Sequence, residues 1–217
     1  MVVHIDVKGF GIGHPARLGR GGADSGIDRH EWNERYAAQP ILWRVDPSPF
    51  LSGELGDRPP GRALDLGAGE GRTAVWLAER GWDVTAVDFS DVALERGRKR
   101  VEALGPPGSV EWICADLVDF DPTGGPYDLV LFLFIHLAPA DRRRLLRRAA
   151  STLAAGGMLL VVGYDTTHVP TSQQGGGPEN RFSPDDIVPD LEGLRIERAE
   201  RLQVGDAVDT VVRAVRD

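Results

Sequence analysis

A glycine-rich turn between acidic residues is the part of this sequence best suited to chemistry. The run reads Asp65–Leu66–Gly67–Ala68–Gly69–Glu70–Gly71 and directly follows an apolar stretch. Gly67 and Gly69 would let the backbone turn tightly and approach a ligand without a Cβ atom in the way. A helix that follows such a turn offers its first backbone amides to an anionic group. The pattern therefore predicts a nucleotide-binding loop.

A second acidic residue, Asp88, limits which class of nucleotide the loop could bind. Asp88 comes seventeen residues after Gly71, at the end of the next apolar run, where a carboxylate can accept hydrogen bonds from both hydroxyls of a ribose. The dinucleotide fingerprint needs glycine or alanine where this chain has Arg72, and no Gly-Lys-Ser/Thr follows as in a P-loop. The G-x-G-x-G spacing after Asp65 suits a ligand that presents an amino group rather than a diphosphate.

Histidines and cysteine add one catalytic candidate and no metal site. The single cysteine, Cys114, lies in the apolar run 110–115 and is expected to be a small buried hydrophobe. His136 follows an apolar strand, where ligands bind in doubly wound sheets, and could act as a general base or only cap the next helix. No i,i+4 or cysteine-paired spacing predicts metal binding among His4, His14, His30, His136 and His168.

The elements that must position these residues alternate along the chain. From residue 61 onward, short β-like runs alternate with helical periods, which indicates a parallel sheet covered by helices. We expect an α/β fold: a Rossmann-like, doubly wound, mostly parallel seven-stranded sheet with a C-terminal antiparallel hairpin. The expected strands are 62–66, 83–88, 110–115, 127–134, 158–164, 193–203 and 207–215. The expected helices are 71–80, 91–103, 139–153, ended by Ala155–Gly156–Gly157, and a short one near 184–188.

The remaining segments are expected to surround that sheet in one domain of residues 29–217. Residues 1–28 are interpreted as a flexible, glycine-rich N-terminal lead-in. Residues 29–58, with Trp32, Arg35 and Tyr36 at helical spacing, are expected to form a helical cap over the cofactor site. The turn-rich stretch 165–181 is interpreted as a loop over a ligand.

Charge and composition limit the partners. There are 25 basic and 33 acidic side chains, so the formal net charge is −8 and the chain repels nucleic acid and anionic lipid. The longest apolar run, residues 129–135, is far shorter than the ~20 residues of a membrane span. We therefore expect no nucleic-acid or membrane partner, and the lone cysteine fits a reducing, cytoplasmic compartment. The sequence leaves the oligomeric state open, a homodimer included.

Taken together, the motifs resemble those of class I S-adenosylmethionine-dependent methyltransferases. The turn at 65–71 is similar to the first motif of that family, 87–89 to its ribose motif, 115–117 to its adenine motif, 127–130 to its fourth strand and 153–157 to its late motif. Within the family, residues 32–36, the segment through Trp43 and residues 134–139 resemble the tellurite-resistance and thiopurine methyltransferase branch.

The resemblance implies a role for each matching residue. Asp65 and the glycine backbone would hold the methionine end of S-adenosylmethionine, Asp88 the ribose hydroxyls, and Asp116 the adenine amino group. Trp43 and Arg44 would shelter the cofactor and meet its carboxylate, although a structural role is equally open for these two. The full set of cofactor-binding candidates is Trp43, Arg44, Asp65, Gly67, Ala68, Gly69, Asp88, Phe89, Asp116, Leu117, Phe132 and Leu133.

The implied reaction is methyl transfer to an O, S or N nucleophile of a small-molecule acceptor, with S-adenosylhomocysteine as product. A thiolate needs only alignment, whereas a hydroxyl needs a base, for which His136 is the first candidate and Asp165 and His168 are weaker ones. The fourth strand ends in Phe-Ile-His. Members of the family that methylate the amino groups of nucleic-acid bases carry an Asn/Asp-Pro-Pro-aromatic pattern at this place. Two alternatives remain open, an NAD(P)-dependent oxidoreductase and a non-catalytic S-adenosylmethionine-binding protein.

Overall fold

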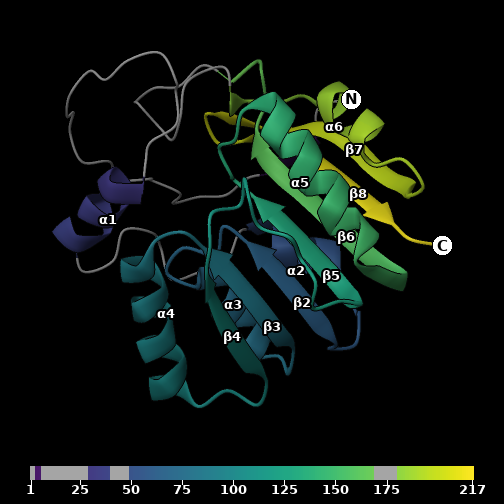
Figure 1. Ribbon diagram of the computed structural model, residues 1–217. Coiled ribbons are helices and arrows are strands. Elements are labelled where there is room, and N and C mark those ends of the chain that lie inside the picture. The colour runs from purple at the N-terminus through teal and green to yellow at the C-terminus, as the bar shows by residue number, and fades with distance from the viewer. Residues whose placement is uncertain (1–2, 6–28, 40–48, 169–179) are drawn as a thin grey trace.

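The computed structural model describes residues 3–5, 29–39, 49–168 and 180–217 (Figure 1). Within these residues, eight strands form one sheet in the order β1-β7-β8-β6-β5-β2-β3-β4. The strands are β1 (Val3–Ile5), β2 (Arg62–Leu66), β3 (Asp83–Asp88), β4 (Ser109–Cys114), β5 (Tyr127–Leu133), β6 (Leu153–Tyr164), β7 (Arg195–Val204) and β8 (Ala207–Val215). The helices are α1 (Arg29–Ala38), α2 (Pro49–Leu55), α3 (Arg72–Ala78), α4 (Asp91–Leu104), α5 (Pro139–Ser151) and α6 (Pro184–Ile187), followed by the 3-10 helix η2 (Val188–Asp190).

The sheet has the Rossmann-like, mostly parallel topology that the sequence predicts. Strands β4, β3, β2, β5 and β6 are parallel, and β8 pairs antiparallel with both β6 and β7. The chain builds outward from β2 through β3 to β4 and then returns to place β5 on the other side of β2. Ligands of doubly wound sheets bind at such a reversal, outside the carboxyl ends of the strands. The fold class is confirmed.

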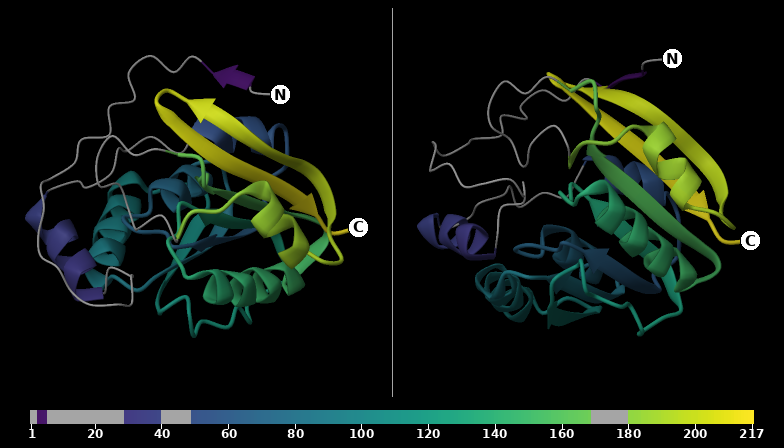
Figure 2. Two further views of the ribbon diagram at one scale, coloured as in Figure 1. Left: turned by 90° about the horizontal axis from the view of Figure 1, so that it is seen from above. Right: turned by 45° about the horizontal axis from the view of Figure 1, so that its top comes forward.

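Helices cover both faces of the sheet (Figures 1 and 2). Successive side chains of a strand point to opposite faces, so β5 is apolar on both sides. Val130 and Phe132 join the core beneath α5 and α6, whereas Leu129 and Leu131 join the core beneath α2 and α3. This continuous apolar run is typical of a parallel strand buried on both faces.

Local capping explains where two helices begin. Ser90 is the N-cap of α4, and its hydroxyl accepts a hydrogen bond from the backbone N–H of Ala93 at 3.1 Å. The short helix α6 begins with a capping box between Ser183 and Asp186. Both starts agree with the sequence prediction.

Three features differ from the sequence analysis. The glycines at 156 and 157 do not end α5, which stops at Ser151; they lie within β6, at an irregularity in its pairing with β5. Cys114 is exposed rather than buried, because β4 is the outer strand of the sheet. Residues 3–5 lie inside the expected lead-in, yet they pair with β7 as an eighth, parallel strand.

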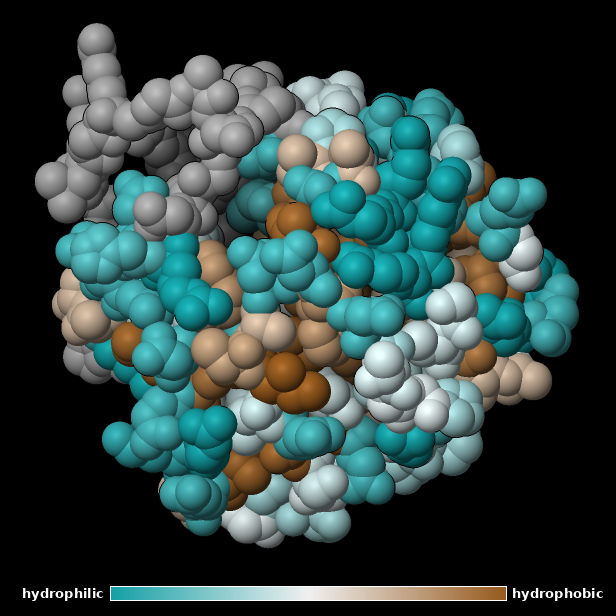
Figure 3. Space-filling view, in the orientation of Figure 1, coloured by the Kyte–Doolittle hydropathy of each residue, from teal (hydrophilic) through white to brown (hydrophobic). Residues whose placement is uncertain are grey.

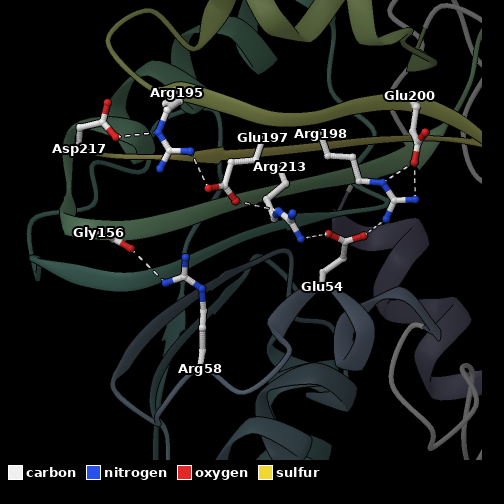
Figure 4. Close-up of polar contacts among 9 residues, drawn as sticks. All are labelled: Glu54, Arg58, Gly156, Arg195, Glu197, Arg198, Glu200, Arg213 and Asp217. Atoms are coloured by element: carbon white, nitrogen blue, oxygen red, sulfur yellow. Dashed lines mark hydrogen bonds and ion pairs between the residues drawn. The ribbon is translucent and has the colours of Figure 1, made fainter.

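A chain of ion pairs ties α2 to the C-terminal hairpin (Figure 4). The buried carboxylate of Glu54 lies between two guanidinium groups, those of Arg198 on β7 and Arg213 on β8, and its contact with Arg213 is 2.9 Å. Glu197 continues the chain from Arg213, at 3.1 Å, to Arg195, at 2.7 Å. These contacts join segments that are far apart in the sequence.

Candidate cofactor and acceptor site

The glycine turn after β2 has the geometry that a close ligand approach requires. Gly67, Gly69 and Gly71 have φ values of 68, 54 and 74°, in the left-handed region that favours glycine. A Cβ atom on Gly67 would lie 2.9 Å from Ile135 Cγ1, and one on Gly69 would lie 2.8 Å from Tyr36 Oη. The turn therefore excludes side chains at both positions, and Gly71 passes directly into α3.

Asp65 is a buried carboxyl group at the end of β2, just before the turn. Its side chain is 2% exposed, and Oδ2 has no hydrogen-bond partner among the described residues. Burial raises the pKa of Asp65 to about 7, an effect that the Arg72 guanidinium opposes. An unpartnered buried carboxyl is costly, and a bound ammonium group would remove that cost.

Asp88 connects the end of β3 to the glycine turn. Its Oδ2 accepts a hydrogen bond from the backbone N–H of Gly69 and its Oδ1 one from Ser90, both at 2.8 Å. Burial raises the pKa of Asp88, while the Ser90 and Gly69 amides act in the opposite direction. A carboxylate has about four acceptor sites, so two sites are left for ribose hydroxyls. Phe89, the next residue, is half-buried.

A short turn at residues 115–120 follows β4. The exposed Asp116 accepts a hydrogen bond from the Val118 N–H on its Oδ1 at 2.9 Å. Leu117 is 8% exposed and packs in the core, and its backbone N–H donates no backbone hydrogen bond within the described residues. The Ala115 N–H donates to the Asp88 carbonyl at 3.0 Å, so this turn is attached to the strand end that carries Asp88.

The other cofactor candidates are placed less directly. Phe132 is fully buried and packs edge-on against Phe182, with ring centroids 6.2 Å apart, so only its backbone could reach a ligand. Leu133 packs against the core on the other face. Trp43 and Arg44 lie outside the described residues, as does most of the expected loop at 165–181.

Aromatic rings gather where β5 and β6 end. The Tyr164 ring is stacked between His136 and His168, at centroid distances of 6.2 and 4.9 Å. Phe134, which packs edge-on against Tyr164 at 5.3 Å, has a φ of 55°, a conformation rare for a residue with a side chain. Backbone strain of this kind concentrates at functional sites.

Electrostatics at this stack keep His136 neutral. Burial lowers the pKa of His136 to about 4, and the Arg181 guanidinium adds to the effect. Burial also lowers the pKa of His168, again with Arg181 as the second cause. His168 Nδ1 accepts a hydrogen bond from the Val208 N–H at 3.3 Å, so its ring proton lies on Nε2. Both imidazoles are therefore uncharged at neutral pH.

Tyr36, which the sequence places in the expected cap, lies near these groups, as do Tyr164 and Asp209, which sequence reasoning missed. Tyr36 of α1 is 4% exposed and lies against Gly69; Tyr164 is the centre of the ring stack. Asp209 pairs with Tyr164 across β6 and β8, and burial, reinforced by the Asp165 carboxylate, raises its pKa to about 7. The Asp209 and Tyr164 positions depend on pairing between distant strands, and no local motif marks them.

Two kinds of feature are absent from the residues that the structure describes. No group of three or more His, Cys, Asp or Glu side chains there is placed to hold a metal ion. None of the helices described is long and apolar enough to cross a membrane.

Comparison with known proteins identifies the central segment. Residues 63–157 match the family model described as "Methyltransferase domain". This segment is therefore similar to methyltransferase domains. It runs from β2 into β6 and contains Asp65, Asp88, Asp116 and His136, whereas Tyr164, His168 and Asp209 lie beyond it.

Curated relatives match this chain over part of their own length. The chain is 38% identical over 95 residues to the tRNA 5-carboxymethoxyuridine methyltransferase of Escherichia coli (strain K12). It is 37% identical over 93 residues to the demethylmenaquinone methyltransferase of Clavibacter sepedonicus. Each match covers 43% of this chain and 35% of the relative, so the chain spans only about a third of the length of these proteins.

Solved structures show the same fold over most of the chain. N-methyltransferase NodS from Bradyrhizobium japonicum WM9, in complex with S-adenosyl-L-homocysteine, has a TM-score of 0.66 at 21% identity and covers 88% of this chain and 99% of its own. Magnesium protoporphyrin IX methyltransferase from Synechocystis PCC 6803, with bound S-adenosylmethionine, has a TM-score of 0.60 at 19% identity, with coverage of 87% and 79%. At these identities the likeness concerns the fold.

Proposed function

We propose that this chain is an S-adenosylmethionine-dependent methyltransferase that acts on a small-molecule acceptor and releases S-adenosylhomocysteine. The observation that carries the proposal is the buried Asp65 carboxyl beside the glycine turn, because its Oδ2 has no hydrogen-bond partner among the described residues and the segment matches a methyltransferase domain model. Both features fit a ligand with an ammonium group that lies against bare backbone.

The residues present fit this cofactor along its whole length. Asp65 would bind the ammonium group, Asp88 the ribose hydroxyls, and Asp116 with the Leu117 N–H the adenine edge. Bound S-adenosylmethionine supplies an electrophilic methyl group on a sulfonium. The protein then aligns donor and acceptor and excludes water, which is most of what an in-line displacement requires.

Residues 29–58 contribute the proposed cap over the cofactor. Asn33 of α1 donates to Asp91 at 2.9 Å and accepts from Ser90 Oγ at 2.6 Å. These contacts attach α1 to the start of α4, directly after Asp88. Tyr36 reaches the glycine turn from the same helix, which supports the cap assignment.

We place the acceptor at the His136–Tyr164–His168 stack, beside the cofactor turn. The Arg72 guanidinium influences the pKa values of both Asp65 and Tyr164, which supports this proximity. A neutral imidazole with a pKa near 4 is a weak base, so His136 could deprotonate only an acidic acceptor. We therefore expect a nucleophile that is already ionised near neutral pH, such as a thiolate or an oxyanion.

The chemistry of the proposed acceptor agrees with the resemblance of residues 32–36 and 134–139 to the tellurite-resistance and thiopurine branch. The net charge of −8 also favours a small molecule over a polyanion, although two curated relatives are named as tRNA and ribosomal RNA methyltransferases. A cytoplasmic location stays a prediction from the sequence, which leaves the oligomeric state open.

Release of S-adenosylhomocysteine, measured from pH 6 to 9, tests the proposal. The acceptor panel contains thiols, phenols, amines, halides, oxyanions such as tellurite, and unmodified tRNA and ribosomal RNA. We expect turnover with thiols or oxyanions and none in Asp65→Asn. Turnover only with RNA would overturn the small-molecule assignment, and failure to bind S-adenosylmethionine in calorimetry would overturn the cofactor assignment.

A further inference from the structure

We propose that Arg148 of α5 is a positioning residue for adenine recognition, acting through the turn at residues 115–120. The inference rests on the proposed function, because it assumes that Asp116 binds the adenine amino group. Arg148 lies outside every motif that the sequence analysis singled out, and its side chain reaches the turn from the outer layer of helices.

Hydrogen bonds connect the α5 arginines to the carbonyl groups of the turn. Arg148 Nη2 donates to the Val118 carbonyl at 3.0 Å and lies 3.5 Å from the Leu117 carbonyl. Arg144 Nη2 also reaches the Val118 carbonyl, at 3.5 Å. Arg144 is exposed and makes a closer contact with Asp141, at 2.7 Å, whereas Arg148 is half-buried, so Arg148 is the principal anchor.

The peptide group between Leu117 and Val118 transmits this anchor to Asp116. The C=O and N–H of a trans peptide lie in one plane and point in opposite directions. On one side, the Leu117 C=O faces Arg148; on the other, the Val118 N–H donates to Asp116 Oδ1 at 2.9 Å. Fixing the plane of this peptide therefore fixes the orientation of the Asp116 carboxylate.

The remaining contacts of the turn do not fix that orientation by themselves. The Asp116 carbonyl accepts from the N–H groups of Asp119, at 3.2 Å, and Phe120, at 2.8 Å, which closes the turn on its far side. The Leu117 side chain anchors one residue in the core. Asp116 itself is exposed, so without the peptide contact its side chain would be free to rotate.

Arg147 provides a matched control on the same helix. Hydrophilic side chains gather over α5 (Figure 3), and Arg147 belongs to this surface: its side chain is 58% exposed and lies 3.7 Å from Asp190, which Arg143 also contacts at 2.8 Å. Arg147→Ala thus removes the same charge from the same helix without affecting the turn.

The test compares binding of S-adenosylhomocysteine with that of S-inosylhomocysteine, in which an oxygen replaces the adenine amino group. We expect the wild-type protein to prefer the adenine ligand. Arg148→Ala should weaken binding of the adenine ligand about tenfold, the loss of roughly one charge-assisted hydrogen bond, and change binding of the inosine ligand less than about twofold, so that the preference disappears. Arg148→Lys, which can still reach one carbonyl, should restore part of the preference.

Each alternative result overturns a different statement. If Arg148→Ala lowers the affinity for both ligands equally, Arg148 has a general structural role. If the affinity for neither ligand changes, the contact does not contribute to binding. Either result overturns the positioning role. Wild-type binding of S-adenosylhomocysteine without a preference for adenine would remove the Asp116 assignment, and this inference with it, but leave the cofactor in place. Failure of the wild-type protein to bind S-adenosylhomocysteine would instead overturn the proposed function.

Discussion

The Asp88 carboxylate accepts a hydrogen bond from the Gly69 backbone N–H at 2.8 Å. This contact joins the two motifs on which the cofactor proposal depends, because Gly69 belongs to the turn after β2 and Asp88 ends β3. The same carboxylate holds the Ser90 N–H at the start of α4. One side chain therefore sets the spacing of the turn, the strand end and the next helix.

Replacing Asp88 with asparagine should weaken S-adenosylhomocysteine binding more than tenfold. Asparagine keeps one acceptor oxygen, so either the Gly69 or the Ser90 amide loses its partner, and acceptor sites for the ribose hydroxyls are lost as well. Such contacts are each worth about 1–3 kcal/mol. Calorimetric titration measures the change, with the exposed Asp119→Asn as control. Equal affinities in the two variants would contradict the assignment.

Binding of S-adenosylhomocysteine should release a proton below about pH 7 through Asp65. Burial raises the pKa of this carboxyl to about 7, and a bound ammonium group favours the ionised form. Titration at pH 6 in buffers of different ionisation enthalpy measures the proton count. Asp65→Asn should abolish the release, whereas Asp209→Asn, which removes the other carboxyl with a pKa of about 7, should retain it. Proton uptake at pH 6 would exclude this role for Asp65.

His136 should reduce stability as the solution becomes acidic. Its pKa in the folded protein is about 4, below the ordinary histidine value of 6.5, so the unfolded chain binds more protons between these two pH values. The stability contributed by neutral His136 is fully present above about pH 6.5 and is lost as the pH falls toward 4. Urea unfolding at several pH values should show a smaller acid loss in His136→Gln than in the wild-type protein. Parallel curves for the two proteins would contradict this burial effect.

Glu54→Gln should lower the free energy of unfolding by about 2 kcal/mol. Breaking a buried ion pair costs about 3–5 kcal/mol, and the partial exposure of Arg198 and Arg213, 27% and 28%, reduces that figure. Urea unfolding measures the loss, with the exposed Glu192→Gln as control. A change below about 0.5 kcal/mol, within the range of ordinary surface substitutions, would show that the network does not stabilise α2.

Much of the fold was predictable because its signals are local. Short apolar runs that alternate with helical periods predicted the strands and the start of α4 at residue 91. The glycine turn was predictable as well, because its positive φ values favour glycine at positions 67 and 69. Each of these features is determined by residues that are close together in the sequence, so it can be predicted from a single sequence.

The remaining features depend on which distant segments become neighbours. The stack of His136 on Tyr164 needs β5 and β6 to end side by side, and the pairing of Asp209 with Tyr164 needs the register of β8. Cys114 is exposed because β4 lies at the edge of the sheet. The apolar residues beside Cys114 in the sequence gave no sign of this position. Residues 3–5 pair with β7, which is nearly two hundred residues away in the sequence. No local sequence pattern predicts this pairing.

The position of β8 between β6 and β7 has a consequence for biosynthesis. Among the described elements, β8 comes last in the sequence, yet it lies inside the sheet. Until residues 207–215 have left the ribosome, the free edge of β6 has no partner from β8, and β7 cannot join the sheet through it. Unpaired edges of this kind invite wrong pairing with other chains. The nascent protein is therefore most open to wrong strand pairing while β8 has not yet emerged.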